Sequence, residues 1–455
     1  MVQQEFHEIT PVIEELAAKA QAADVIDSSL YAEYDVKRGL RDLNGVGVLA
    51  GLTHISQVRA TKVVDGVKVP DYGQLIYRGY DIKDLVHGIL DSGRFGYEEV
   101  AYLLIAGSLP NKDQLADFCE RVGSRRELPE GYLAIFPRMA YRPSIMNVLQ
   151  RATLLLYAFD PTPDDTKPIH EVDVALSLLG RWPRVASIAY AAENSERYDQ
   201  KLRIPPARTD YSIAESILDV LRGDEGFTRE EALLLDVMLM LHAEHGGGNN
   251  STFTTRVLSS SGTDAYSAYA AALGSLKGPK HGGANYKAGE MIEDIAAHVS
   301  NWESDDEVAL YLTKILQRDA FDRTGLIYGL GHAVYTVTDP RAEIVKRYAA
   351  KLAAEKGQAD KLELIKRVER LGPEVMRNVR GITKPISTNI DMYTGFVYQM
   401  LGVPRELFTP IFAIARMAGW AAHRMEELYG PARIIRPAYN AVMKRTDYKP
   451  LAERD

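Results

Sequence analysis

Apolar residues recur at three- and four-residue intervals over most of the chain, a spacing that is typical of amphipathic α-helices. Short breaks of Gly, Pro or Asp separate the segments, as expected for successive helices. Representative segments are residues 8–24, 97–107, 171–182, 229–245 and 342–357. The pattern therefore predicts a mainly α fold.

One stretch, residues 45–82, differs from the rest. It carries runs of β-branched residues that are interrupted by Gly and by Asp65-Gly66. Such runs, with Asp-Gly between two of them, predict short strands and a β-hairpin near the N-terminus.

The segment 229–245 has the clearest helix signals. Thr228 and Glu231 have the spacing of a capping box, which predicts that the helix begins here. Its body, Ala232–Leu241, is apolar on nearly every face, which indicates a helix buried in a large all-α core.

The chain has 455 residues, which is more than a single hydrophobic core ordinarily accommodates, so we expect two lobes. No Pro- or Ser-rich linker separates two halves, so the second lobe should be inserted into the first. We predict an N-terminal helical extension (1–44), a large domain (45–281 with 391–455) and a small domain (282–390).

Charge and cysteine content exclude several classes of protein. The net charge of −8 gives no general attraction to nucleic acid or to anionic membranes. Cys119 is the only cysteine, so an intrachain disulfide is impossible. The chain shows no signal-peptide pattern and no run of about 18 apolar residues. We therefore expect a cytoplasmic protein that does not bind membranes.

Histidines lie beside glycines in three places. His242 and His245 precede three glycines and, three residues apart, would share a helical face. A polar helix end is the simpler interpretation of this stretch, and a metal site is the weaker one. His281 follows a Gly-Pro turn and precedes a predicted helix, where the dipole favours a neutral ring; capping of that helix is the alternative. His332 and Arg341 stand nine residues apart in "GLGHAVYTVTDPR".

Acidic and basic residues complete the set of candidates. Asp391 precedes the apolar run Met392–Leu401, where the helix N-terminus would keep it ionised as a base; an N-cap is the alternative. Arg416 has apolar neighbours at three and four positions, so its guanidinium needs a carboxylate from the protein or from a ligand. With Arg341 and Arg436 it suggests a clamp for a di- or tricarboxylate.

Seven ordered motifs together resemble the citrate synthase family, which includes 2-methylcitrate synthases. They are "GQLIYRGYDI", "HAEHGGGNNST", "GPKHGGAN", "GLGHAVYTVTDPR", "NIDMYTG", "AIARMAGW" and "RPAYN", and the likeness covers residues 45 to 440. It implies a mostly helical fold whose large and small domains close over the substrates, and a homodimer.

The resemblance also implies roles for the catalytic residues. Asp391 would remove a proton from the methyl group of acetyl-CoA, and His281 would donate a hydrogen bond to the thioester oxygen. His332 would protonate the ketone oxygen of oxaloacetate as the carbon–carbon bond forms. Water would then hydrolyse citryl-CoA.

Binding residues follow from the same resemblance. His245, Arg341 and Arg416 would hold oxaloacetate, Arg436 would reach in from the partner subunit, and Arg78 would also line the oxoacid pocket. CoA would contact Leu326, Ile327, Tyr328, Gly329, Leu330, Lys277, Lys280 and Lys384. No metal or other cofactor is implied, because the histidines and arginines supply the positive electrostatics.

Four alternatives stay open on the sequence. They are a 2-methylcitrate synthase using propionyl-CoA, an enzyme that cleaves citryl-CoA, a metal-dependent hydrolase built on His242 and His245, and a non-catalytic homologue that binds CoA or citrate.

Overall fold

The computed structural model describes residues 9–42, 46–139, 144–197, 204, 206–332, 334–382, 384–431 and 433–454. The chain divides into two compact units, Met1–Leu52 and Thr53–Asp455. The first unit contains α1 (Pro11–Ala23), α2 (Ser29–Glu33) and the 3-10 helix η1 (Arg38–Leu40). The helix predicted over 8–24 is confirmed as α1, except that residue 8 lies outside the described residues.

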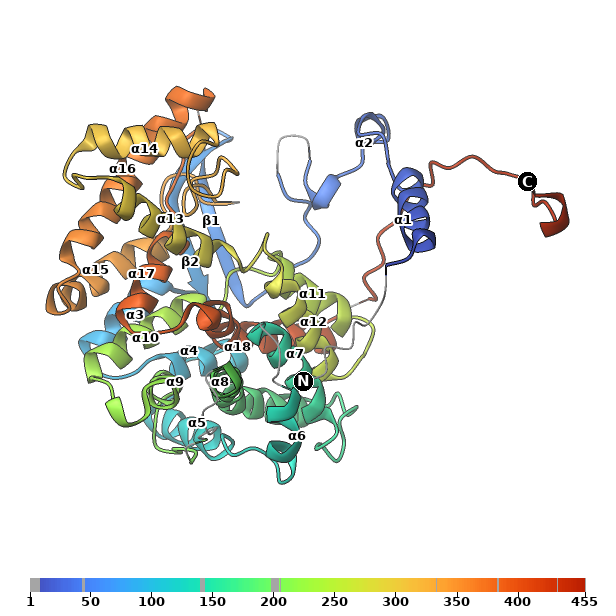
Figure 1. Ribbon diagram of the computed structural model, residues 1–455. Coiled ribbons are helices and arrows are strands. Elements are labelled where there is room, and N and C mark those ends of the chain that lie inside the picture. The colour runs from blue at the N-terminus through green and yellow to red at the C-terminus, as the bar shows by residue number, and fades with distance from the viewer. Residues whose placement is uncertain are drawn as a thin grey trace. The chain divides into compact units, whose positions relative to one another are not determined.

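The second unit is built mainly of helices, which confirms the predicted fold class (Figure 1). Its α-helices are α3 (Ile82–Asp91), α4 (Tyr97–Ala106), α5 (Lys112–Ser124), α6 (Tyr132–Met139), α7 (Ile145–Tyr157), α8 (Pro168–Arg197), α9 (Ile213–Arg222), α10 (Arg229–His242), α11 (Asn250–Ser259), α12 (Ala265–Lys277), α13 (Ala284–His298), α14 (Asp305–Gln317), α15 (Pro340–Glu355), α16 (Ala359–Arg380), α17 (Asp391–Met400) and α18 (Phe408–Tyr429). The 3-10 helices are η2 (Gly223–Glu225), η3 (Arg405–Leu407) and η4 (Leu451–Glu453).

The predicted hairpin is confirmed. Strands β1 (Ser56–Val64) and β2 (Val67–Tyr77) pair antiparallel, and the short β3 (Tyr80–Asp81) pairs with the end of β2. Asp65 and Gly66 both have positive φ (51° and 79°), the conformation of a tight two-residue turn. Residues 46–51, which share the β-branched pattern of 45–82, form no strand in the described structure; Gly47 makes an isolated antiparallel bridge with Arg41.

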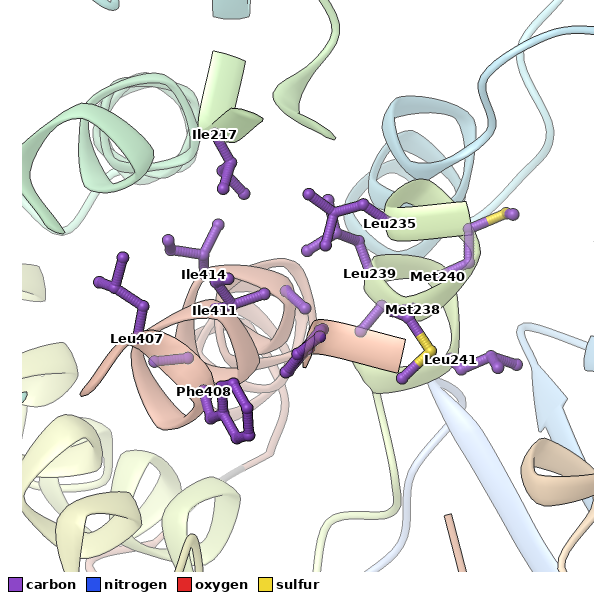
Figure 2. Close-up of a cluster of buried hydrophobic side chains, with 14 of the residues drawn as sticks. Ile217, Leu235, Met238, Leu239, Met240, Leu241, Leu407, Phe408, Ile411 and Ile414 are labelled. Carbon is purple, nitrogen blue, oxygen red and sulfur yellow. The ribbon is translucent and has the colours of Figure 1, made fainter. Parts of the chain in front are cut away.

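The core depends on the packing of α10 against α18. Thr228 and Glu231 form the predicted capping box at the start of α10, and the helix body is buried on all sides. Figure 2 shows Leu235, Met238 and Leu239 of α10 facing Ile411 and Ile414 of α18. A helix that is apolar all round is stable only inside such a core, so α10 and α18 form a fixed frame for the residues that follow them.

The predicted division into a large domain (45–281 with 391–455) and a small domain (282–390) stays a prediction; residues 46–52 of the predicted large domain belong to the first unit. The boundary at 44 and 45 lies outside the described residues. Among the described residues, none of the helices combines the length and the apolar character that a membrane span requires.

Gly419 lets α18 approach the loop that follows α10. A Cβ placed on Gly419 would lie 2.4 Å from both the carbonyl oxygen of Ala243 and Oε2 of Glu244. Since a backbone carbonyl has little freedom to move, this position has no room for a side chain.

Gly419→Ala should therefore destabilise the protein by about 1 to 3 kcal/mol through overpacking. The matched control is Gly88→Ala on the exposed face of α3, where a new Cβ meets nothing within 4 Å; this change should stabilise by about 0.5 to 1 kcal/mol. Urea unfolding of both variants measures the difference, and equal effects would contradict the close approach of α18.

Candidate active site

His332 is held in one tautomer by its own loop. Its Nδ1 accepts backbone N–H groups from Val334 (3.0 Å) and Tyr335 (2.9 Å). Because Nδ1 acts as an acceptor, a neutral ring carries its proton on Nε2. The Tyr335 ring stacks on His332 at a centroid distance of 4.6 Å, and His245 lies edge-on to it at 5.2 Å. The loop thus presents an N–H donor beside a second imidazole.

The glycines before His332 attach this loop to the segment before Asp391. Gly331 donates its N–H to the Ser387 carbonyl (2.8 Å), and Asn389 donates its N–H to the Gly329 carbonyl (2.9 Å). Gly329 has φ +84°, and a Cβ there would lie 2.9 Å from Cα of Met392. Only glycine fits this conformation and this space, so His332 and Asp391 are positioned by the same backbone ladder.

Asp391 is the first residue of α17, as predicted, but it is not the N-cap. Ile390 occupies the cap position, so the capping alternative is wrong. Burial raises the pKa of the Asp391 carboxyl to about 6; Arg341 opposes this shift and Asp339 adds to it. Burial thus outweighs the helix dipole that the sequence suggested. The carboxylate remains mostly ionised at neutral pH, and a pKa near the working pH suits a base.

His281 lies in the turn before α13 and does not cap that helix, whose cap position is Gly283. Nε2 of His281 accepts the backbone N–H of Ser251 (3.3 Å) and lies 2.9 Å from the Ser251 hydroxyl oxygen. Burial, assisted by the charge of Arg416, lowers the pKa of His281 to about 4. The ring is therefore neutral, as predicted, and its proton is left on Nδ1.

Arg341 is paired within the protein. Its Nε and Nη2 donate to the two oxygens of Asp339 (3.0 and 2.8 Å), and both residues are almost fully buried. Asp339 raises the pKa of Arg341 despite burial. The same carboxylate accepts the backbone N–H of Ile390 (3.2 Å). Asp339 thereby connects the arginine to the start of the helix that carries Asp391, and Nη1 of Arg341 makes no hydrogen bond to a described residue.

Arg416 is the buried cation that the sequence indicated, with 1 % of its surface exposed. Its Nε donates to the His242 carbonyl (2.6 Å), and its guanidinium lies 4.7 Å from the centroid of the Phe412 ring. Burial lowers the pKa of Arg416 to about 10, and the nearby charge of Glu244 opposes that shift. Its two Nη groups form no hydrogen bond within the described chain, which leaves four N–H donors for a ligand.

His242 and His245 do not share a helical face, because α10 ends at His242. Nδ1 of His242 lies 2.7 Å from the Met238 carbonyl oxygen; among the described residues, the buried Nε2 atoms of His242 and of His245 have no hydrogen-bond partner. Burial and the charges of Arg341 and His332 lower the pKa of His245 well below its usual range. Among the described residues no group of His, Cys, Asp and Glu could hold a metal ion.

The remaining predicted binding residues lie elsewhere or on the surface. Arg78 donates twice to the Leu104 carbonyl (3.1 and 2.8 Å). Arg436 is exposed in the extended segment after α18. The predicted CoA-contacting loop precedes His332; Ile327 is buried within it, Tyr328 and Leu330 are partly buried, and Leu326 is exposed. Exposed lysines of this set are Lys277, Lys280 and Lys384.

Sequence reasoning missed Asp339, Glu244 and Ser251. Asp339 stands two residues before Arg341, in an Asp-Pro pair that is a frequent helix start, and this signal could have identified it as the partner. Glu244 and Ser251 had no local signal of this kind, since their contacts are made to residues distant in the chain.

Charge interactions and ring contacts connect these residues into one cluster. Arg416 acts on His281 and on His245, Arg341 acts on His245 and on Asp391, and His245 contacts His332. The arrangement offers one base, two neutral N–H donors and two guanidinium groups in a buried setting. Such a set can enolise a carbonyl compound while binding an anionic partner.

The family model for the C-terminal domain of citrate synthase matches residues 43–438. The citrate synthase of Haloferax volcanii is 33% identical over 424 residues, which are 92% of this chain and 99% of that protein. The 2-methylcitrate synthase 1 of Corynebacterium glutamicum is also 33% identical, over 93% of this chain and 100% of its own.

Solved structures show the same relationship. The citrate synthase of Pyrobaculum aerophilum aligns with a TM-score of 0.73 at 27% identity, covering 92% of this chain and 95% of that one. The ternary complex of carboxymethyl coenzyme A and oxaloacetate with the citrate synthase of Thermoplasma acidophilum aligns with a TM-score of 0.72 at 26% identity, covering 90% and 97%.

The raised pKa of Asp391 predicts a pH-dependent gain in stability for Asp391→Asn. The folded protein holds this proton up to a pH of about 6, whereas the usual pKa is 3.8, so ionisation between these values costs folding free energy. The neutral amide avoids that cost. The gain should be near zero below pH 4 and reach roughly 1 to 3 kcal/mol above pH 6.

Urea unfolding at several pH values measures this gain. The control is Asp360→Asn, at an exposed position in the first turn of α16, which should show no such gain. A loss of stability in Asp391→Asn above pH 6 would contradict the assigned burial of the carboxylate.

Proposed function

Because the chain belongs to the citrate synthase family, we propose that it condenses acetyl-CoA with oxaloacetate and hydrolyses the resulting citryl-CoA to citrate and CoA. The observation that supports this most strongly is the combination of a buried carboxylate of raised pKa with two neutral histidines. Arg341 acts on Asp391, Arg416 acts on His281, and both arginines act on His245.

Enolisation of acetyl-CoA would need a base and an acid together, because the proton next to a thioester is too weakly acidic for a free carboxylate. Asp391 would take the methyl proton. Nδ1–H of His281 would donate a hydrogen bond to the thioester oxygen as negative charge develops there. The low pKa of His281 favours this role, since a neutral ring can stabilise the enol without transferring its proton completely.

Condensation would then join the enol carbon to the keto carbon of oxaloacetate. As that carbonyl becomes an alkoxide, Nε2–H of His332 would give it a proton. Nη1 of Arg341, the Nη groups of Arg416 and the unpartnered Nε2 of His245 would bind the carboxylates and the carbonyl of oxaloacetate. Water would finally attack the thioester of citryl-CoA, and the C–S bond would break to release CoA as the thiol.

The remaining contacts belong to the same proposal. The loop from Leu326 to Leu330 would cradle the adenine end of CoA, with Lys277, Lys280 and Lys384 available for its phosphates. Arg436 would enter the site of a partner subunit in a homodimer, and Arg78 would border the oxoacid pocket. No metal or other cofactor is required, because arginines and imidazole N–H groups would stabilise each developing negative charge.

A second candidate function is 2-methylcitrate synthesis from propionyl-CoA. It is favoured by the 2-methylcitrate synthase 1 of Corynebacterium glutamicum, whose 33% identity to this chain equals that of the citrate synthase of Haloferax volcanii. The two reactions differ by one methylene in the acyl pocket, which is worth only about 1 to 3 kcal/mol.

Release of free CoA thiol tests the proposed reaction. The purified protein with acetyl-CoA and oxaloacetate should release thiol, and Asp391→Asn should lower the rate by about 10² to 10⁴ because the base is lost. Asp360→Asn serves as the control and should keep the activity of the unmodified protein. Absence of thiol release with both acetyl-CoA and propionyl-CoA would overturn the proposal.

The same assay decides between the two acyl chains. We expect kcat/KM for acetyl-CoA to exceed that for propionyl-CoA by roughly 10- to 200-fold, the effect of one additional methylene in a fitted pocket. A higher kcat/KM for propionyl-CoA would instead identify a 2-methylcitrate synthase.

A further inference from the structure

Glu244 is a buried carboxylate to which neither the reaction nor the binding set assigns a role. It lies directly before His245, and none of its surface is exposed. Its Oε1 accepts three hydrogen bonds, from the Ser56 hydroxyl (2.8 Å), the Gly246 N–H (2.6 Å) and Nε2 of His423 (2.9 Å). Its Oε2 is also buried, yet it has no hydrogen-bond partner in the part of the chain that the structure describes.

The free oxygen of Glu244 lies against α18, one turn from Arg416. A Cβ on Gly419 would lie 2.4 Å from Oε2, and Arg416 precedes Gly419 by three residues on the same helix. Arg416 donates Nε to the carbonyl of His242, two residues before Glu244. The carboxylate and the guanidinium are therefore close, buried and not hydrogen-bonded to each other.

His423 also contacts this carboxylate. Its Nδ1 accepts Nε–H of Arg256 (3.1 Å), so its Nε2 carries the hydrogen that is donated to Glu244. Arg256 is itself paired with Glu426 and Glu427. Of the charges that act on Arg416, Glu244 has the largest effect. The Glu244 carboxylate thus acts on Arg416 as well as on His423.

We propose that Glu244 is the resident counter-charge of the oxoacid pocket. It compensates Arg416 while the site is empty and competes with the substrate carboxylate for the same guanidinium. Asp339 does the equivalent for Arg341 by direct hydrogen bonds. Glu244 is therefore a positioning residue that acts through Arg416: it keeps the empty site folded and weakens substrate binding. This inference rests on the proposed function, because it takes oxaloacetate as the ligand.

The test compares the rise in Tm on adding oxaloacetate in the full-length protein and in Glu244→Gln. The amide keeps the size of the side chain but removes its charge. Without oxaloacetate the variant should melt at a lower temperature. With oxaloacetate its Tm should rise more than that of the unmodified protein, because the ligand carboxylate replaces the missing charge. The Kd for oxaloacetate should fall roughly tenfold.

Glu171→Gln is the matched control. Glu171 pairs with Arg424, which also belongs to α18, and both side chains are almost completely buried. Loss of the Glu171 charge should lower Tm as well, but it should leave the rise in Tm on adding oxaloacetate unchanged. Glu244→Asp keeps the charge and should restore the ligand-induced rise of the unmodified protein, even if its own stability is lower.

The outcomes separate two failures. If oxaloacetate does not raise the Tm of the unmodified protein, the proposed substrate is wrong and the proposed role of Glu244 is overturned as well. If it does, but Glu244→Gln shows an equal or smaller rise, the role of Glu244 alone is overturned. A Glu244→Gln variant that stays unfolded at saturating oxaloacetate overturns it too, since the ligand then fails to replace the charge.

Discussion

The burial of two guanidinium groups is the constraint on which the rest of the site depends. Taking a charge out of water costs several kcal/mol unless an opposite charge or good hydrogen bonds compensate it. Arg341 is compensated by two hydrogen bonds to Asp339, whereas Arg416 has one backbone acceptor and the nearby charge of Glu244. Arg416 is therefore the incompletely satisfied cation, and an anionic ligand would complete its environment.

The same low-polarity setting accounts for the protonation states of the reacting groups. Burial disfavours charge on both acids and bases, so it raises the pKa of Asp391 and lowers that of His281. Arg416 lowers the pKa of His281 further, while Arg341 limits the rise at Asp391. One electrostatic environment thus yields a carboxylate that is ionised at neutral pH and an imidazole that stays neutral.

Local signals in the sequence predicted the elements that carry the site. The capping box at Thr228, the Asp65-Gly66 turn and the helix beginning at Asp391 all depend on residues close in the chain. Arg416 was recognisable because a cation among apolar helical neighbours needs a partner. The seven motifs then indicated which distant segments belong to one site, which no single segment could show.

Features that depend on distant contacts could not be predicted in this way. The end of α10 at His242 separates it from His245, although a continued helix fitted the local pattern. The partner of the Arg78 guanidinium is the carbonyl of Leu104, 26 residues further along. Glu244 is held by Ser56, which lies 188 residues away. Backbone carbonyls and distant partners of this kind leave no trace in a periodicity or a motif.

In the proposed reaction, His281, His332 and Asp391 surround an oxoacid held by Arg341 and Arg416. A crystal structure of the protein with oxaloacetate and carboxymethyl coenzyme A would show whether they do. We expect the oxaloacetate carboxylates on Nη1 of Arg341 and on the Nη groups of Arg416, with Nε2 of His332 at the keto oxygen and Asp391 beside the carboxymethyl group. Oxaloacetate bound away from both arginines, or Asp391 directed away from the coenzyme, would contradict it.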